Sequence, residues 1–367
     1  MKIQFLNLKK QIEGIKYKIY SSIDKNIKTS QFINGSDVRK FENEFARYLN
    51  IKYCQGVANG TDALEIALKV LNLKKNSEVI VPANTWISTA EAVINNGLNV
   101  KFVDIDETHN ICLEDLNKKI SKKTSAIIAV HLYGNPAKID KISKLCKKKK
   151  IKLIEDCAQS HGAEYKGIKT SLFSDIATFS FFPSKNLGGF GDAGCIVTNN
   201  KNYFYKAKKI SNHGGLKKNS HLIIGRNSRL DNIQAGVLRI KLKELDKWIN
   251  QRNSQANLYF KLLSKIKQIN LINIEKNTKS SFHLFVIRVK ARNKLKKFLE
   301  SKKIQTMIHY PKSLPELNIF KKNRPRSWKK MKVVNLNKQI LSLPIGEHLN
   351  LNEIKYVCNK IKNFYSE

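Results

Sequence analysis

Lys185 stands in a setting that a solvent-exposed lysine does not need. It follows an apolar, strand-like run and leads directly into a glycine-rich loop, within FSFFPSKNLGGFGDAG (179–194). Glycines let the backbone pass close to a neighbouring group, and a lysine amine can act as a covalent anchor and a proton carrier. The segment therefore predicts a lysine with a chemical role.

The glycines after Lys185 also match the pattern G-x-G-x-x-G, from Gly189 to Gly194. That fingerprint of dinucleotide binding requires a strand before the glycines and a helix that begins within them. The residues that follow here, CIVTNN, favour a strand instead. The glycines are therefore interpreted as a tight connection between two strands.

Asp156 stands at the carboxyl end of an apolar, strand-like run, within LIEDCAQSHG (153–162). Open α/β sheets bind their ligands at the carboxyl ends of the strands. A carboxylate there can keep a pyridine nitrogen protonated while a lysine bonds to the same ring, which is the pair that pyridoxal phosphate (PLP) requires. Considered alone, Asp156 also fits a residue that forms a turn or caps a helix.

Two further junctions between a strand and a helix could hold the rest of such a cofactor. Gly60 and Thr61 begin a predicted helix, where free backbone N–H groups and the helix dipole favour a phosphate. Trp86 lies just past a strand end, from which its ring could stack on an aromatic cofactor. An ordinary helix cap and a core tryptophan remain open as alternatives.

The elements that must position these residues alternate between helix and strand from residue 54 onward. Apolar runs separated by helices of this length indicate βαβ units and a mostly parallel sheet. Strands are predicted at 78–82, 100–106, 125–134 and 151–158, and helices at 61–71, 85–96, 113–120 and 138–149.

After residue 170 the pattern changes to two strands joined by the loop that carries Lys185. A long helical stretch over 231–266 follows, and then a strand at 281–289 and a helix at 293–303. We therefore predict a large PLP-binding α/β domain, with the N-terminal segment, over 1–248, and a small C-terminal α+β domain over 249–367.

The net charge of +39, from 68 lysines and arginines, is spread along the whole chain. Its densest run, CKKKKIK (146–152), ends a predicted helix, where the dipole favours cations. No helix-turn-helix extension, zinc-ligand spacing or stripe of basic and aromatic residues indicates a nucleic-acid partner. The charge is interpreted as solvated surface, part of which attracts an anionic substrate.

The six cysteines are scattered without a Cys-x-x-Cys pair, so free thiols are expected and no metal site. No apolar run approaches the roughly 20 residues of a membrane span. The first residues lack the apolar core of a secretion signal. We therefore expect a cytoplasmic protein that has no membrane partner.

Taken in order, these segments resemble the DegT/DnrJ/StrS family of PLP-dependent sugar aminotransferases, which have the aspartate aminotransferase fold (fold type I). One such motif would be weak evidence, but the ordered set covers nearly the whole chain. The matching segments include GVANGTDALEIAL, VPANTWISTAEAV, IIAVHLYGNPA, IEDCAQSHGA, FSFFPSKNLGGFGDAGCIVT, GRNSRLDNIQAGVL and, near the C-terminus, IHYP.

The resemblance implies a homodimer with active sites at the subunit interface and a ping-pong reaction. An amino acid, L-glutamate, would donate an amino group that passes to C-3 or C-4 of a nucleotide-linked keto-deoxysugar. The product would be a nucleotide-linked amino sugar for a surface glycan such as the O-antigen of lipopolysaccharide.

Carried over to this sequence, the resemblance implies that Lys185 anchors PLP and that Asp156 pairs with the pyridine nitrogen. The other residues with implied roles are Gln159 at the ring O3′, Trp86 on the ring face, Gly60, Thr61 and Ser180 at the phosphate, Asn227 reaching the phosphate from the partner subunit, and Arg229, His309 and Tyr310 at the substrate.

Two positions depart from the family pattern. Phe182 stands where the family often has tyrosine, and Arg226 where it has tyrosine or phenylalanine. Related sugar dehydratases have histidine in place of the anchoring lysine, so Lys185 argues against that alternative. A regulatory protein that binds nucleic acid is the alternative from a different class.

Overall fold

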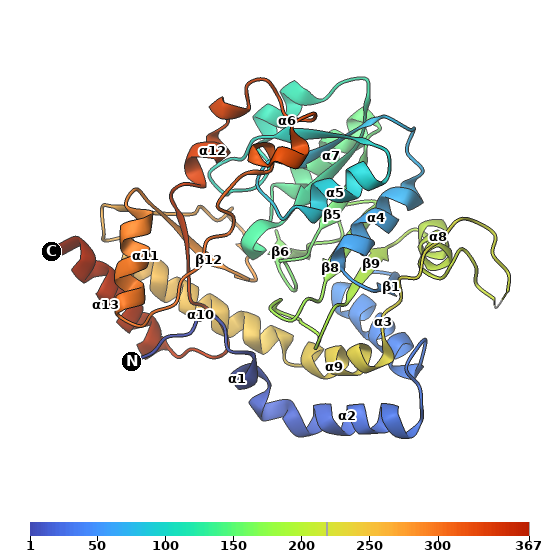
Figure 1. The fold of residues 1–367 in the computed structure, drawn as a ribbon, viewed down its shortest axis with the longest axis horizontal. Coiled ribbons are helices and arrows are strands. Elements are labelled where there is room, and N and C mark those ends of the chain that lie inside the picture. Colours follow the sequence, from blue (N-terminus) through green and yellow to red (C-terminus); the bar gives the residue numbers. More distant parts are fainter. Residues whose placement is uncertain (218, 367) are drawn as a thin grey trace.

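The computed structural model describes residues 1–217 and 219–366, and its centre is a sheet of seven strands in the order β1-β9-β8-β5-β4-β2-β3 (Figure 1). Neighbouring strands from β8 to β3 are parallel, and β9 runs antiparallel to both β8 and β1. The strands are β1 (Tyr53–Val57), β2 (Glu78–Pro82), β3 (Asn99–Val103), β4 (Thr124–Val130), β5 (Lys152–Asp156), β8 (Ile176–Ser180) and β9 (Gly194–Thr198). The predicted mostly parallel sheet is confirmed.

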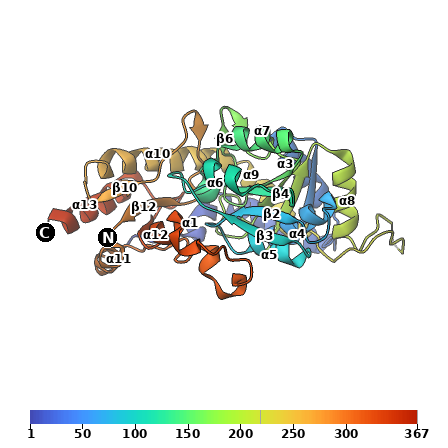
Figure 2. The same ribbon diagram turned by 90° about the horizontal axis from the view of Figure 1, so that it is seen from above.

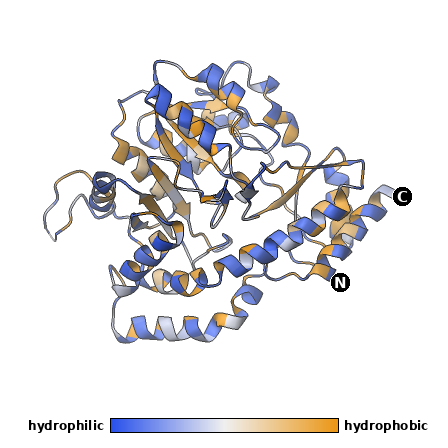
Figure 3. Ribbon diagram, turned by 180° about the vertical axis from the view of Figure 1, so that it is seen from behind, coloured by the Kyte–Doolittle hydropathy of each residue, from blue (hydrophilic) through white to orange (hydrophobic). Residues whose placement is uncertain are grey.

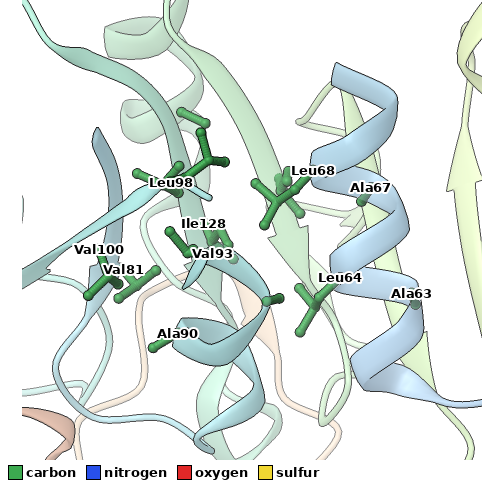
Figure 4. Close-up of a cluster of buried hydrophobic side chains, with 14 of the residues drawn as sticks. Ala63, Leu64, Ala67, Leu68, Val81, Ala90, Val93, Leu98, Val100 and Ile128 are labelled. Carbon is green, nitrogen blue, oxygen red and sulfur yellow. The ribbon is translucent and has the colours of Figure 1, made fainter. Parts of the chain in front are cut away.

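The strands are continuous apolar runs because both faces of the sheet are covered by helices. In β4, Ile128 faces one layer of helices and Ile127 the other, as the two-residue period of a strand requires. Figure 4 shows the first layer, in which Leu64 and Val93 pack towards Ile128. The helices of this layer are α4 (Gly60–Leu71), α5 (Ser88–Asn95) and α8 (Lys201–Ser211).

The opposite face is covered by helices whose buried residues recur at helical spacing. On α7 these are Ile139, Ile142 and Cys146, which pack against Ile127 and Leu153 of the sheet. The helices of this layer are α3 (Ser36–Leu49), α6 (Leu113–Lys119), α7 (Ile139–Lys149) and α9 (Asn232–Leu242). Figure 3 shows apolar strands inside and polar outer faces on the helices.

A second, smaller sheet lies to one side of the first, in the order β10-β12-β13 (Figures 1 and 2). Its strands β10 (Ile269–Leu271), β12 (Phe285–Val289) and β13 (Ile340–Leu343) are antiparallel. Around it lie α10 (Leu245–Leu263), α11 (Arg292–Ser301) and α13 (Leu351–Ser366). The other α-helices of the described residues are α1 (Leu8–Ile12), α2 (Lys16–Lys28) and α12 (Lys332–Leu336), and the other strands are β6 (Glu164–Tyr165), β7 (Ile168–Lys169) and β11 (Thr278–Lys279).

The predicted continuous helix over 231–266 is wrong, since α9 and α10 are separate helices. The N–H of Glu244 bonds to the carbonyl of Lys241, and this tighter turn interrupts the α-helical hydrogen bonds.

The predicted domain boundary at residue 248 falls inside α10. Leu245 and Ile249 pack in the core of the large sheet, whereas Tyr259 packs in the core of the small one, together with Ile3. The division itself stays a prediction.

All six cysteines are free thiols, and five of them are buried. None of the described helices is both long and apolar enough to cross a membrane.

Arg252 on α10 holds the smaller unit together through a buried ion pair. Its Nε donates to Glu347 Oε1 at 2.6 Å and its Nη1 donates to the carbonyl of Phe282 at 3.0 Å. Replacing Arg252 with methionine leaves the Glu347 carboxylate buried without its partner, and we expect a loss of ~3–5 kcal/mol in unfolding free energy. Denaturant unfolding measures this.

The matched control is Lys247→Met on the same helix, because that side chain is 78% exposed and pairs only loosely with Glu244. We expect a change within ~0.5 kcal/mol. Equal effects of the two variants would contradict the importance of the buried pair.

Candidate active site

Several of the predicted residues meet at the carboxyl edge of the large sheet. Asp156 ends β5 and Ser180 ends β8, and the two strands are neighbours in parallel register. The loop after β8 carries Lys185, and Gly60 begins α4, which packs against β8.

Asp156 is 5% exposed and is held by two donors. The Thr89 hydroxyl donates to Oδ2 at 3.0 Å, and the backbone N–H of Ala158 donates to Oδ1 at 3.1 Å. Burial raises the pKa of this carboxyl, while both donors and the charge of Lys185 act in the opposite direction. Asp156 is thus a fixed hydrogen-bond acceptor at the strand end.

Lys185 lies in a loop that folds back on the end of β8. Its backbone N–H donates to the carbonyl of Phe182 at 2.8 Å. Removal from water lowers the pKa of the Lys185 amine to about 8, while attraction to Asp156 acts to raise it. At neutral pH roughly a tenth of the amine is then uncharged, far more than for an ordinary lysine.

We expect the reactivity of Lys185 towards an acylating reagent to rise with pH, with a midpoint near 8. Reactivity rises with pH because the neutral amine is the nucleophile, and deprotonation increases the fraction of Lys185 that is neutral. Competitive labelling of cofactor-free protein, read peptide by peptide in a mass spectrometer, measures the midpoint. An exposed lysine such as Lys147 serves as the control, and a Lys185 midpoint above pH 10 would contradict the assignment.

Gly60 forms a close-packed cradle at the start of α4. A Cβ on this residue would lie 2.6 Å from the Cβ of Ser180, so a side chain cannot fit. The side chain of Asn59 caps the helix by accepting the N–H of Asp62 at 2.8 Å. The preceding N–H groups of the first turn have no partner within the helix, and they suit an anion such as a phosphate.

Gln159, Tyr310 and Trp86 form a contiguous group beside Asp156. Gln159 Nε2 donates to the Tyr310 hydroxyl at 3.0 Å, and the Tyr310 and Trp86 rings are 5.6 Å apart. Trp86 is 58% exposed, so the alternative of a core tryptophan is wrong. His309 adjoins this group and bonds through Nδ1 to the Ser342 hydroxyl at 2.9 Å.

Asn227 and Arg229 lie in the segment between α8 and α9, where Arg229 Nη1 donates to Asn212 Oδ1 at 3.4 Å. Among the described residues, no hydrogen bond or ion pair joins either of them to Lys185 or Asp156. Asn227 is exposed, and the residues on each side of it contact the start of α4 in the same chain. Ser228 Oγ accepts the N–H of Ala58 at 3.2 Å, and Arg226 forms ion pairs with Asp62, at 2.9 Å, and with Glu65.

Sequence reasoning missed two residues that fix the candidate site. Thr89 donates to Asp156, and the backbone N–H of Tyr133 donates to Gln159 Oε1 at 2.6 Å. Both lie in segments that the family resemblance includes, but neither a helix threonine nor a backbone N–H carries a signal of its own.

A family model for the DegT/DnrJ/EryC1/StrS aminotransferase family matches residues 14–362. The chain belongs to this family. Its relatives include a dTDP-3-amino-3,4,6-trideoxy-alpha-D-glucose transaminase of Streptomyces venezuelae, 34% identical over 99% of this chain and 96% of the relative. A UDP-2-acetamido-2-deoxy-3-oxo-D-glucuronate aminotransferase of Pseudomonas aeruginosa is 36% identical over 98% and 100% of the two chains. A pleiotropic regulatory protein of Geobacillus stearothermophilus is 36% identical over 100% of this chain and 99% of the relative.

The fold of this aminotransferase is also that of solved relatives. The structure of S. venezuelae DesV in complex with a ketimine intermediate superposes with a TM-score of 0.97, at 33% identity and over 100% of this chain and 99% of that one. A Bacillus subtilis structure with bound pyridoxamine phosphate superposes with a TM-score of 0.90, at 28% identity and over 100% of this chain and 86% of that one. The predicted family, fold type and PLP cofactor are confirmed, and the chain is a PLP-dependent aminotransferase.

The residues at the sheet edge fit PLP. A buried carboxylate, an amine with a lowered pKa and free backbone N–H groups at the start of α4, beside Ser180, are three features that suit the cofactor. When bound, PLP supplies a ring that delocalises the electrons released as a substrate carbon loses its proton.

Proposed function

We propose that this enzyme moves an amino group from L-glutamate to a nucleotide-linked keto-deoxysugar, at C-3 or C-4 of the sugar. The product, a nucleotide-linked amino sugar, serves surface glycan synthesis such as that of O-antigen. The buried Lys185 amine, which the Asp156 carboxylate attracts at the same sheet edge, carries the proposal, and the names of the nucleotide-sugar relatives support its substrate class.

We assign the chemical roles to this chain's residues as follows. Asp156 would keep a proton on the ring nitrogen, and Gln159 would hold the ring oxygen O3′. Lys185 would anchor the cofactor and, as a free amine, would carry a proton between the substrate carbon that bears the amino group and C4′ of the cofactor. Its lowered pKa suits this task, since an amine near neutrality both accepts and releases a proton readily.

The phosphate and substrate ends of the site involve the remaining residues. Gly60, Thr61 and Ser180 would bind the phosphate, and Trp86, whose ring adjoins Tyr310, would lie against the cofactor ring. His309 and Tyr310 contact the sugar; burial and repulsion from Lys185 lower the pKa of His309 to about 4, so its imidazole is neutral. Arg229 contacts an anionic group of the substrate.

The test is a panel of dTDP-, UDP- and GDP-linked keto-sugars incubated with glutamate and read by mass spectrometry. We expect one member to gain an amino group while an equal amount of glutamate becomes 2-oxoglutarate. Loss of water from the sugar without glutamate consumption would indicate a dehydratase instead. Failure of every member with every amino donor would contradict the proposal.

We further propose that the enzyme is a cytoplasmic homodimer in which Asn227 reaches the partner's phosphate site. Exposure of Asn227 between two anchored neighbours supports a role towards another chain. Partners beyond the second subunit and the two substrates are not expected, neither nucleic acid nor membrane.

Subunit mixing tests the dimer proposal. Lys185→Ala and Asn227→Ala are each expected to be impaired, since each lacks one part of every site. In a mixed dimer, one site draws intact Lys185 from one chain and intact Asn227 from the other, so a 1:1 mixture should recover about a quarter of wild-type activity. Recovery no greater than the sum of the two variants, once exchange is demonstrated, would contradict the cross-subunit role.

A further inference from the structure

The loop that carries Lys185 rests on helix α9 through two side chains. Lys241 Nζ donates to the carbonyl of Gly188 at 2.7 Å. Gln234 Oε1 accepts the backbone N–H of Phe190 at 2.7 Å. The two residues are two helical turns apart, so they lie on one face of α9, which Figure 1 shows beside the loop that leaves β8.

Lys241 is an unusual lysine because only 1% of it is exposed. Burial lowers the pKa of its amine to about 8, while the distant Glu347 acts to raise it. Among the described residues it forms no ion pair with a carboxylate, and its hydrogen bond is the one to Gly188. Burying an amine in this way costs free energy. We therefore infer that the hydrogen bond from Lys241 to Gly188 has a role in the fold or the site.

Backbone hydrogen bonds close the loop that contains both Gly188 and Lys185, so a shift of Gly188 would also move Lys185. The N–H of Gly189 donates to the carbonyl of Phe181 at 2.7 Å, while the N–H of Lys185 donates to that of Phe182. A Cβ on Gly188 would lie 2.4 Å from the carbonyl oxygen of Pro183, and one on Gly189 would lie 2.8 Å from Gln234. The loop therefore has little room to shift unless its hold on α9 is released.

We propose that Lys241 is a positioning residue for Lys185. Together with Gln234, it fixes the glycine loop on α9 and thereby keeps the Lys185 amine beside Asp156. The inference rests on the proposed role of Lys185. It gives α9 the role of positioning the loop that carries Lys185, which no residue discussed above fills.

Lys241→Met, purified with PLP, tests the inference, and Lys243→Met is the matched control because Lys243 is exposed just past the end of the same helix. We expect kcat to fall ~10- to 100-fold, as a misplaced reacting group typically costs, with the KM for glutamate nearly unchanged. The pH at which the visible absorbance of the bound cofactor changes should also shift. Lys243→Met should match the wild type in both measurements.

Gln234→Leu keeps the test decisive if Lys241→Met does not fold, because Gln234 is only half-buried. We expect its kcat and absorbance midpoint to change in the same direction. A variant that is less stable but keeps the wild-type kcat and midpoint would show a merely structural role and overturn the inference. Failure of the proposed role of Lys185 is distinguishable, since wild-type protein would then not carry PLP on Lys185.

Discussion

Lys185→Ala is expected to abolish turnover with glutamate and any keto-sugar. Removing a positioned acid–base group costs ~10²–10⁴-fold in rate, and this variant also loses the proposed covalent anchor of the cofactor. PLP should still bind without a covalent bond, because the Gly60 cradle and Asp156 are untouched. The rate of 2-oxoglutarate formation measures the loss.

The control for this variant is replacement of Lys147 and Lys148, which lie in the exposed basic run that ends α7. Exposed substitutions usually change stability by less than ~0.5 kcal/mol, and we expect wild-type kcat. An active Lys185→Ala enzyme, or activity that follows the basic run, would refute the assignment of Lys185.

Asp156→Asn should lower kcat by ~10²-fold or more, the size typical of removing one preorganised electrostatic partner. The amide has nearly the same shape, but it carries no charge to stabilise a protonated ring nitrogen. The change should also lower the pKa of Lys185 below about 8, because the charge of Asp156 acts to raise it. Steady-state kinetics and the competitive labelling of Lys185 measure the two effects.

Asp192→Asn is the matched control for the loss of one negative charge. Asp192 belongs to the same glycine loop as Lys185 but is exposed. Its replacement should leave kcat and the labelling midpoint close to wild type. If both aspartate variants behave alike, the special role of Asp156 is excluded.

Parts of the fold that depend on local pattern could be predicted from the sequence. The strand at 78–82 and the two strands on either side of Lys185 appear as predicted, because strands buried on both faces are recognisable apolar runs. The position of Asp156 at a strand end follows from the same pattern.

Contacts between distant segments could not be predicted. Tyr310 accepts a hydrogen bond from Gln159 and its ring lies 5.6 Å from that of Trp86, and nothing local in IHYP indicates either partner. The break between α9 and α10 was also hidden, because no proline or glycine marks it and the turn depends on one shifted backbone hydrogen bond.

Arg226 shows how a departure from a family pattern acquires meaning only in three dimensions. In sequence it is a basic residue where an aromatic one is usual. In the structure it pairs with Asp62 and Glu65 on the first two turns of α4, the helix that Gly60 begins. The charge of Arg226 is therefore paired with carboxylates of its own chain.

Borohydride reduction of the purified enzyme, followed by peptide mapping in a mass spectrometer, tests the central claim most directly. Reduction makes the bond between PLP and its anchoring lysine permanent. We predict that the added mass of the cofactor appears on the peptide that contains Lys185, and that Lys185→Ala shows none. Cofactor fixed to a different lysine, or wild-type protein that binds no PLP, would contradict the account.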